Sequence, residues 1–319
     1  MPPVRWHGEA GIIEAARRAV YRDSPRLWRC DAVTQQSGAP MLNDEQISRW
    51  HQDGFLVLPH FKPPEALAAL RERSLAIVDA LVVDGTLPVF STRDRSRLAD
   101  EALLASADQV HCFFEEDAVD ADGRLQVPKT QAINKIGHAL HDRDPIFERF
   151  SRDPALAELA RDLGLAQALL MQSMLIFKQP RIGGEVNWHQ DASFLRTAPH
   201  SVIGFWFALE DATRDNGCLW VEPGGHRGPL RERYGRTTEG LKMERLDDMP
   251  WPEGSRTKAL EVPAGTLVVF DGLLPHASAV NRSENSRLAY TLHAVNAGAV
   301  YSPLNWLQRS PEFPARGLA

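Results

Sequence analysis

The hydrophobic periodicity of this 319-residue chain changes at about residue 170, and this change limits the folds that the chain can adopt. Before that point apolar residues recur with helical spacing, and beyond it they occur in short runs rich in β-branched and aromatic residues. Gly, Pro, Asn and Asp separate these runs, which span residues 171–177, 202–209, 218–221, 260–262, 266–270 and 288–295. Six or more short strands with long connections predict a sandwich or jelly roll. The helices of the first half would pack against one side, which makes an α+β protein.

The first half contains recognisable helix starts and stops. Asn43, with Gln46 three residues later, is typical of a capping box, so we expect a helix over 44–53 that ends at Gly54. The other segments that we expect are a strand over 55–58, an amphipathic helix from Pro63-Pro64, irregular structure over 83–130 and a helix over 154–169.

Composition excludes several classes of protein. The chain carries 36 Lys and Arg against 42 Asp and Glu, a net charge of −6, without a dense basic stripe. Neither nucleic acid nor a membrane is therefore an expected partner. Three widely spaced cysteines without a CxxC pair indicate reduced thiols, and we see no secretory leader and no apolar run of about 20 residues. We expect a cytoplasmic protein that acts on a small molecule.

Residues 1–40 differ from the rest of the chain, because a polar Gln-Gln-Ser-Gly-Ala-Pro run precedes Met41. We interpret them as an N-terminal extension outside the fold. It is either native or the product of an upstream start codon chosen in place of Met41. No internal linker, repeat or low-complexity segment divides residues 41–319, so we expect one domain there.

The tripeptide His189-Gln190-Asp191 is the first candidate for chemistry. On an extended chain residues i and i+2 point the same way, so one imidazole and one carboxylate would face a single ion. The same tripeptide occurs at His51-Gln52-Asp53, but there it lies in the last turn of an expected helix, where i and i+2 point about 200° apart. We therefore assign a metal only to the first copy.

A third ligand is available at His276, where a β-rich run ends at a Gly/Pro turn. Two histidines and one carboxylate form the facial triad of non-haem Fe(II) oxygenases, which leaves three coordination positions open. Arg287 follows eleven residues later, and Ser278 lies between the two. Splitting O₂ requires two electrons beyond those of the metal, which 2-oxoglutarate supplies. Its distal carboxylate needs a planar cation such as Arg287, with the Ser278 hydroxyl beside it.

The remaining histidines receive structural interpretations. His226, in a turn after a strand, is structural or faces the substrate, whereas His111 and His293 lie in apolar contexts and are core residues or supports of the ligands. The chain has no Walker loop, dinucleotide fingerprint or Ser/His/Asp order. Two interpretations remain for a set of apolar residues: they line the substrate site, or they pack in the core. The residues are Phe113, Phe114, Phe194 and Leu195.

The ordered motifs closely resemble those of the phytanoyl-CoA dioxygenase family. The motifs that carry the likeness are His189-Gln190-Asp191, Trp206 through Ala212, Asn216-Gly217-Cys218-Leu219-Trp220, Pro223-Gly224-Gly225-His226, His276-Ala277-Ser278 and Arg287. The likeness extends from about Met41 almost to the carboxyl end. One departure is Gly225, where the family usually has serine, which removes a hydroxyl near a loop that faces substrate.

The resemblance implies a fold, a reaction and a set of site residues. The fold is a double-stranded β-helix, a cupin-like jelly roll that holds the metal between its sheets. The implied iron ligands are His189, Asp191 and His276; Arg287 and Ser278 hold 2-oxoglutarate, and Lys135, Met174 and Trp206 line the cosubstrate site. Gln172, Met174, Ile176 and Lys178 alternate onto one strand face, in agreement with that lining.

The predicted function is therefore hydroxylation of a small-molecule C–H bond, with O₂ and 2-oxoglutarate as cosubstrates and ascorbate as a reductant. Related halogenases have a small residue where this chain has Asp191, so the carboxylate favours hydroxylation. Two alternatives remain: a non-catalytic sensor of 2-oxoglutarate or iron, and a metal-dependent cupin enzyme that does not use 2-oxoglutarate. The identity of the substrate is left open by the sequence, and a CoA thioester has no clear basic cluster to bind it.

Overall fold

The structure is a computed structural model that describes residues 40–83, 87–90, 101–120 and 122–318. The extension predicted over residues 1–40 lies outside the described residues, apart from Pro40. Within the described ranges, no helix combines the length and the apolar character needed to cross a membrane.

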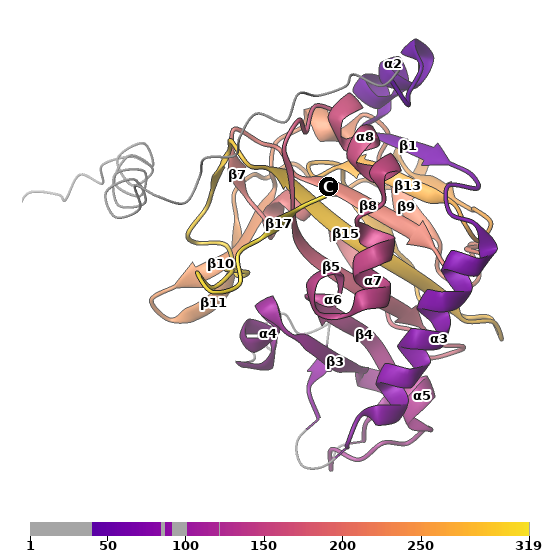
Figure 1. Cartoon of the computed structure of the whole chain (residues 1–319). Helices are drawn as coiled ribbons and strands as arrows, with labels where there is room; N and C mark the ends of the chain where they lie inside the picture. The colour runs from indigo at the N-terminus through magenta and orange to yellow at the C-terminus, as the bar shows by residue number, and fades with distance from the viewer. Residues whose placement is uncertain (1–39, 84–86, 91–100, 121, 319) are drawn as a thin grey trace, which may run out of the picture.

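Two mainly antiparallel sheets form the core, and they confirm the predicted α+β jelly roll (Figure 1). The larger sheet runs in the order β1-β13-β8-β15-β5-β4-β3-β2, and β17 pairs with β5. Its strands are β1 (Phe55–Leu58), β2 (Val89–Phe90), β3 (Val110–Glu115), β4 (Ile133–His138), β5 (Ala168–Lys178), β8 (Ile203–Ala208), β13 (Leu267–Asp271), β15 (Arg287–Asn296) and β17 (Arg316–Gly317). The smaller sheet runs β12 (Lys258–Leu260), β9 (Leu219–Val221), β14 (His276–Ser278) and β6 (Val186–His189). Two strand pairs stand apart: β10 (Glu232–Thr237) with β11 (Gly240–Arg245), and β7 (Thr197–Ala198) with β16 (Val300–Tyr301).

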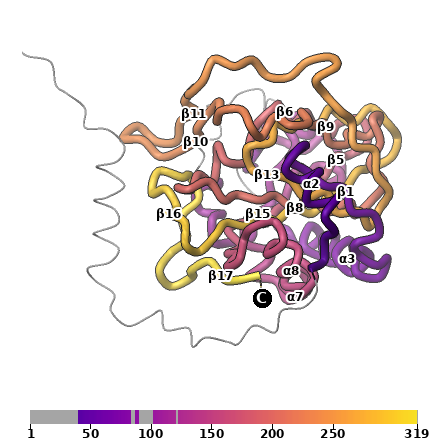
Figure 2. Tube along the Cα trace, turned by 90° about the horizontal axis from the view of Figure 1, so that it is seen from above, coloured from indigo at the N-terminus to yellow at the C-terminus, as the bar shows by residue number. Residues whose placement is uncertain are grey.

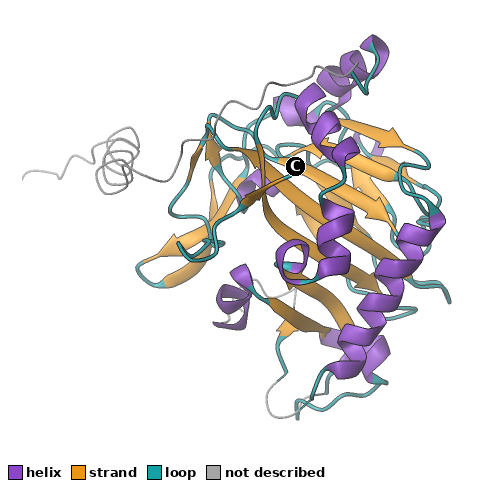
Figure 3. Cartoon of the chain, in the orientation of Figure 1, coloured by secondary structure: helices purple, strands orange, loops and turns teal. Residues whose placement is uncertain are grey.

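The described helices come from the first half of the chain, and most of them gather on one face of the larger sheet (Figure 3). They are α2 (Asp44–Asp53), α3 (Pro64–Ala80), α4 (Glu101–Ala105), α5 (Lys129–Ala132), α6 (Leu140–Arg143), α7 (Pro145–Ser151) and α8 (Pro154–Asp162). The exception is α4, whose Leu103 packs on the other face and lines a cavity there. Seen from above, α7 and α8 lie on the opposite side of β8 and β15 from β6 and β9 (Figure 2). The order of layers is therefore helices, larger sheet, smaller sheet.

Strand alternation divides the core into two parts. On β8, Phe205 and Phe207 pack against helix residues such as Phe150, whose ring centroid lies 5.0 Å from that of Phe207. Trp206 and Ala208 point the other way, into the space between the two sheets. The inner face of the larger sheet, the face turned away from the helices, is thus the one available to a site.

The structure corrects three sequence predictions. The helix expected over 154–169 ends at Asp162, because Gly164 (φ +95°) takes a left-handed conformation that stops the helix, and β5 begins at Ala168. The region 83–130 is not irregular throughout, since β3 pairs with β4 inside the larger sheet. The hairpin β10–β11 was not predicted, because its strands carry few apolar residues (Tyr234, Leu241 and Met243) among charged ones.

Gly54 shows how a glycine fixes the start of the fold. The capping box of Asn43 and Gln46 begins α2 as predicted, and Gly54 ends it in the left-handed region at φ +80°. A Cβ at this position would lie 2.3 Å from the His226 ring, so Gly54→Ala adds a clash to the backbone strain. We expect the variant to lose more than about 1 kcal/mol of unfolding free energy, measured by urea denaturation.

Gly164→Ala is the matched control for this prediction. Gly164 also has a positive φ, but nothing lies within 4 Å of the Cβ that alanine would add. Gly164→Ala should therefore lose only the unfolding free energy that corresponds to the strain of alanine at a positive φ. Equal losses in the two variants would show that contact with His226 contributes nothing.

Candidate active site

His189, Asp191 and His276 come together between the two sheets. Each offers one ligand atom, and these atoms all lie within 4.8 Å of one another, which makes this the one such group of three among the described residues. His189 ends β6, and His276 begins β14 as its register partner in the smaller sheet. Gln190 is extended (φ −123°, ψ 134°), so His189 and Asp191 face the same side, as the tripeptide predicted.

Both histidines of this group direct Nε2 toward Asp191, because each Nδ1 is bonded to a backbone carbonyl. The Nδ1–H of His189 donates to the carbonyl of Asn187 at 2.8 Å, and the Nδ1–H of His276 donates to that of Leu274 at 3.0 Å. The Nε2 atoms then carry lone pairs, and they lie 3.8 Å and 3.7 Å from Oδ1 of Asp191. Fixing the tautomer through a backbone carbonyl is what orients a metal-binding imidazole.

The charges of this group suit a divalent cation. Burial, and then the neighbouring His276, lower the pKa of His189 to about 3, so its imidazole is neutral at pH 7. Burial alone would raise the pKa of Asp191, but the surrounding imidazoles of His293, His276 and His189 outweigh it, and the net shift is downward. Two imidazole nitrogens and one carboxylate oxygen form a donor set that fits Fe(II).

The inner face of β15 extends from this group toward a buried arginine. The residues along it form rows with their register partners on β5 and β8: Gln172–His293–Gly204, Met174–Thr291–Trp206, Ile176–Ala289–Ala208 and Lys178–Arg287. The ligand group lies beside the first row, because Asp191 Oδ2 is 3.0 Å from His293 Nε2. Arg287 therefore lies at the far end of the same wall, three rows along.

Arg287 is a cation without a carboxylate partner among the described residues. Its side chain is 2% exposed, and burial lowers its pKa to about 10, which still leaves it charged at neutral pH. Nη2 donates to Ser278 Oγ at 3.4 Å, whereas Nε and Nη1 have no hydrogen-bond partner. A buried guanidinium with two open donors is suited to a bidentate carboxylate.

The residues that the resemblance assigned to the cosubstrate site lie between these two ends. Trp206 and Met174 flank Thr291 in one row, and Lys135 of β4 is the register partner of Ile176 in the next. All of them line a cavity of about 210 Å³ that also contains the three ligand residues, Ser278 and Arg287. Burial lowers the pKa of Lys135 to about 7. Their roles stay predictions, but the structure brings every predicted site residue to one cavity.

Comparison with known proteins identifies the family of the chain that forms this cavity. A family model for phytanoyl-CoA dioxygenase (PhyH) matches residues 50–289. The chain belongs to the phytanoyl-CoA dioxygenase family. Phytanoyl-CoA dioxygenase domain-containing protein 1 from Bos taurus is 41% identical over 286 residues, with 86% of this chain and 97% of the relative covered. Phytanoyl-CoA dioxygenase 1 from Oryza sativa subsp. japonica is 43% identical over 274 residues, with 85% and 95% covered.

Solved structures support the fold of this family member. The carbocyclase SnoK from nogalamycin biosynthesis, described as non-heme and alpha ketoglutarate dependent, has a TM-score of 0.58 and 18% identity, with 87% of this chain and 99% of SnoK covered. EctD from S. alaskensis, solved with 2-oxoglutarate and 5-hydroxyectoine, has a TM-score of 0.57 and 21% identity, with 89% and 87% covered. The predicted jelly roll and the dioxygenase class are confirmed. The predicted cofactors, iron and 2-oxoglutarate, are the ones with which EctD was solved.

Sequence reasoning missed part of the cavity lining of this dioxygenase. Tyr234 and Met243 come from the hairpin β10–β11, and His138 and Trp306 come from β4 and the C-terminal segment. In the sequence these four residues look like ordinary buried residues, because an apolar or aromatic side chain that lines a cavity has the same pattern as one that packs in a core. Of the four residues with two interpretations, Phe194 lines the cavity, whereas Phe113, Phe114 and Leu195 are core residues, which is the second interpretation.

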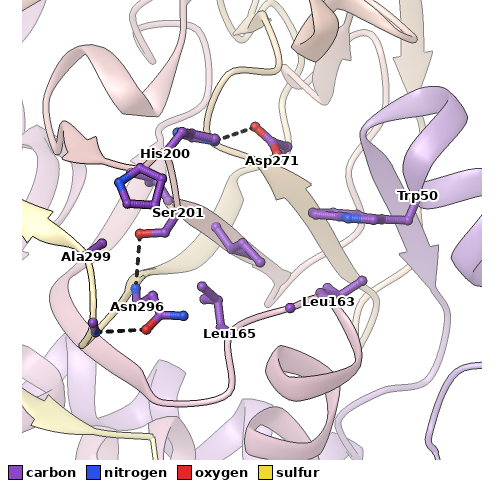
Figure 4. A pocket seen from close by; sticks show the side chains of 13 residues that line it. Trp50, Leu163, Leu165, His200, Ser201, Asp271, Asn296 and Ala299 are labelled. Carbon is purple, nitrogen blue, oxygen red and sulfur yellow. Dashed lines mark hydrogen bonds and ion pairs between the residues drawn. The ribbon is translucent and has the colours of Figure 1, made fainter.

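A second cavity, of about 460 Å³, shares no lining residue with the first (Figure 4). Its polar groups are already paired: His200 Nε2 lies 2.8 Å from Asp271 Oδ1, and the backbone N–H of Asn296 donates to Ser201 Oγ at 3.1 Å. Trp50 lies at the opposite wall. Because these polar side chains satisfy one another, we assign no ligand to this cavity.

Proposed function

We propose that this chain is an Fe(II)- and 2-oxoglutarate-dependent dioxygenase that hydroxylates a C–H bond of a small molecule. His189, Asp191 and His276 would hold Fe(II), and Arg287 with Ser278 would hold the distal carboxylate of 2-oxoglutarate. The observation that carries the proposal is the pairing of a three-ligand group with an unpaired buried guanidinium on one cavity wall.

The side chains prepare this site before any ligand arrives. The backbone carbonyls of Asn187 and Leu274 hold the two imidazoles with Nε2 directed at the metal position. Ser278 donates its only hydroxyl proton to the carbonyl of Gly217 at 2.8 Å and accepts from Arg287, so in this arrangement it would help to hold the carboxylate by orienting the guanidinium. When bound, Fe(II) and 2-oxoglutarate supply the electrons that divide O₂ between substrate and succinate, with release of CO₂.

The lining of the cavity limits the substrate. Its cations are Lys135, Lys178 and Arg287, and Lys178 Nζ already donates to the carbonyls of Gly184, Ser278 and Ala279. Aromatic side chains of Phe194, Tyr234 and Trp306 contribute to the rest of the lining. We infer a compact substrate with an apolar body, because Lys178 is already paired and Arg287 is assigned to 2-oxoglutarate, so these cations form no cluster open to the polyphosphate of a CoA thioester. The exclusion of nucleic acid and membrane partners and the cytoplasmic location stay predictions from the sequence.

Succinate release tests the proposal directly. Protein loaded with Fe(II) under anaerobic conditions and then given 2-oxoglutarate, ascorbate and air should release succinate slowly without an added substrate, and faster with the true one. His189→Ala and Arg287→Ala should remove this signal, because the first takes away a proposed iron ligand and the second takes away the proposed carboxylate anchor.

The alternatives give different results in the same experiment. Binding of 2-oxoglutarate that depends on Arg287 but yields no succinate under any substrate would indicate a sensor. Turnover that depends on metal but not on 2-oxoglutarate would indicate a cupin enzyme of another kind. Failure to bind 2-oxoglutarate at all would overturn the cosubstrate assignment.

A further inference from the structure

Three residues form a row across neighbouring strands beside the proposed iron ligands. His293 of β15 is the register partner of Gln172 on β5 and of Gly204 on β8. The register of β15 against β5 shifts immediately after His293, which is the mark of a β-bulge. Bulges commonly redirect a side chain near an active site.

The hydrogen bonds of His293 define which nitrogen faces the ligand group. The Nε2–H₂ group of Gln172 donates to Nδ1 of His293 at 3.1 Å, so Nδ1 is the acceptor and Nε2 carries the proton. That Nε2 lies 3.0 Å from Asp191 Oδ2. Apart from this imidazole, Asp191 Oδ2 is buried without a partner among the described residues.

The two oxygens of Asp191 therefore have different neighbours. Oδ1 faces the Nε2 atoms of His189 and His276, at 3.8 Å and 3.7 Å, and Oδ2 faces His293. Gly204 makes this arrangement possible, because a Cβ there would lie 2.8 Å from Oδ2 and 2.5 Å from the Phe270 ring. A side chain in this position would push the carboxylate away from His293.

We infer that His293 is a positioning residue for Asp191, oriented by Gln172 and given room by Gly204. The imidazole occupies Oδ2, so that Asp191 presents only Oδ1 to the metal. A carboxylate that bound through both oxygens would take a coordination position that 2-oxoglutarate or O₂ requires. This inference rests on the proposed function, because it takes Asp191 as an iron ligand.

Metal affinity of the resting protein tests the inference without any turnover. We expect His293→Leu to weaken binding of Mn(II), measured by anaerobic calorimetry, by about 10- to 100-fold, the usual effect of losing an outer partner of a metal ligand. His293→Gln keeps an N–H donor and should recover most of the affinity. Gln172→Leu should weaken binding less, and the double variant should be no worse than His293→Leu, because the two residues act through one contact.

Tyr290→Phe is the matched control on the same strand. Its hydroxyl is hydrogen-bonded to Ser151 at 2.8 Å on the helix-facing side of β15, so the variant should lower the unfolding temperature but leave the Mn(II) affinity unchanged. Should His293→Leu fail to fold, His293→Phe keeps an aromatic ring in the same place without the N–H donor and should weaken binding in the same direction.

The outcomes separate this inference from the proposed function. Wild-type Mn(II) affinity in His293→Leu, or in His293→Phe if the former does not fold, overturns the positioning role. A loss of affinity in Asp191→Ala would then leave the ligand assignment standing. Wild-type affinity in Asp191→Ala overturns the ligand assignment itself, and the positioning role with it.

Discussion

Asp191→Ala is expected to abolish Fe(II) binding and, with it, all succinate release. Asp191 supplies the only negative charge in the ligand group, because the other two members are imidazoles. Burial and His276 keep the imidazole of His189 neutral at pH 7. The variant therefore loses both a ligand atom and the charge that compensates a divalent cation. The loss of affinity should exceed the about 10- to 100-fold that an outer partner contributes. Anaerobic titration with Fe(II), followed by the succinate assay, measures both effects.

The chain contains a natural control for this variant. His51-Gln52-Asp53 repeats the tripeptide, but it lies in the last turn of α2 before Gly54, as the sequence predicted. Asp53→Ala should leave the metal stoichiometry at one per chain and the affinity at the wild-type value. One metal lost on Asp53→Ala, or retained on Asp191→Ala, would contradict the assignment of the site.

The ligand group was predictable because each of its parts has a local sequence signal. His189 and Asp191 are two residues apart on an extended segment, and His276 follows a Gly/Pro turn at the end of a β-rich run. The contrast with residues 51–53 shows that the tripeptide alone was not sufficient. Its prediction depended on the conformation expected for the surrounding chain.

The supporting row of Gln172, His293 and Gly204 was not predictable in the same way. Its residues come from three strands, and they meet only because β15 lies between β5 and β8 in one particular register. The shift after His293 changes that register by a residue, which no alternation pattern in a single strand reveals. The sequence indicated His293 as core or support, but gave it no partner.

The sequence predicted which segments form strands better than it predicted where each strand begins and ends, because strand ends also depend on contacts with neighbouring strands. All six predicted β-rich runs overlap strands, but the run expected over 260–262 belongs to β12, which spans Lys258–Leu260. The ends of a strand depend on its neighbour, here β9, because pairing of Lys258 with Val221 is a tertiary contact. The hairpin β10–β11 was missed because its strands carry few apolar residues, although it contributes Glu232, Tyr234 and Met243 to the cavity lining.

Arg287 had a weak signal in the sequence, since only its spacing from His276 pointed to it, but its surroundings in the structure are distinctive. Its burial makes the assignment specific. Removing a guanidinium from water without a counter-charge destabilises the folded protein, and Nε and Nη1 of Arg287 make no hydrogen bond that offsets this loss of hydration. The nearby Trp206 ring, 5.6 Å from its guanidinium carbon, offers only a cation–π contact. An unpaired buried cation of this kind is suited to an anionic ligand, which would supply the missing counter-charge.

Arg287→Met should therefore separate ligand binding from stability. We expect the affinity for 2-oxoglutarate to fall by about 100-fold or more, since two hydrogen bonds to a charged group contribute about 1.5–3 kcal/mol each. The unfolding temperature of the ligand-free variant should not fall, and should rise if the methionine packs well, because an apolar side chain replaces an unpaired charge. Wild-type protein should instead be stabilised by added 2-oxoglutarate in proportion to the logarithm of its concentration above Kd. Calorimetry and thermal unfolding with and without 2-oxoglutarate measure these effects.

Two further variants decide why the affinity falls in Arg287→Met. Arg287→Lys keeps a positive charge but loses the planar fork, so an intermediate affinity is expected if the ligand is a bidentate carboxylate. Arg214→Met removes the same charge from an exposed pair with Glu261, 3.0 Å apart, and should leave both affinity and response to 2-oxoglutarate unchanged. If Arg214→Met weakens 2-oxoglutarate binding as much as Arg287→Met does, the effect is long-range electrostatics. If Arg287→Met binds 2-oxoglutarate like the wild type, the guanidinium serves another anion, and the cosubstrate must be held elsewhere in the cavity.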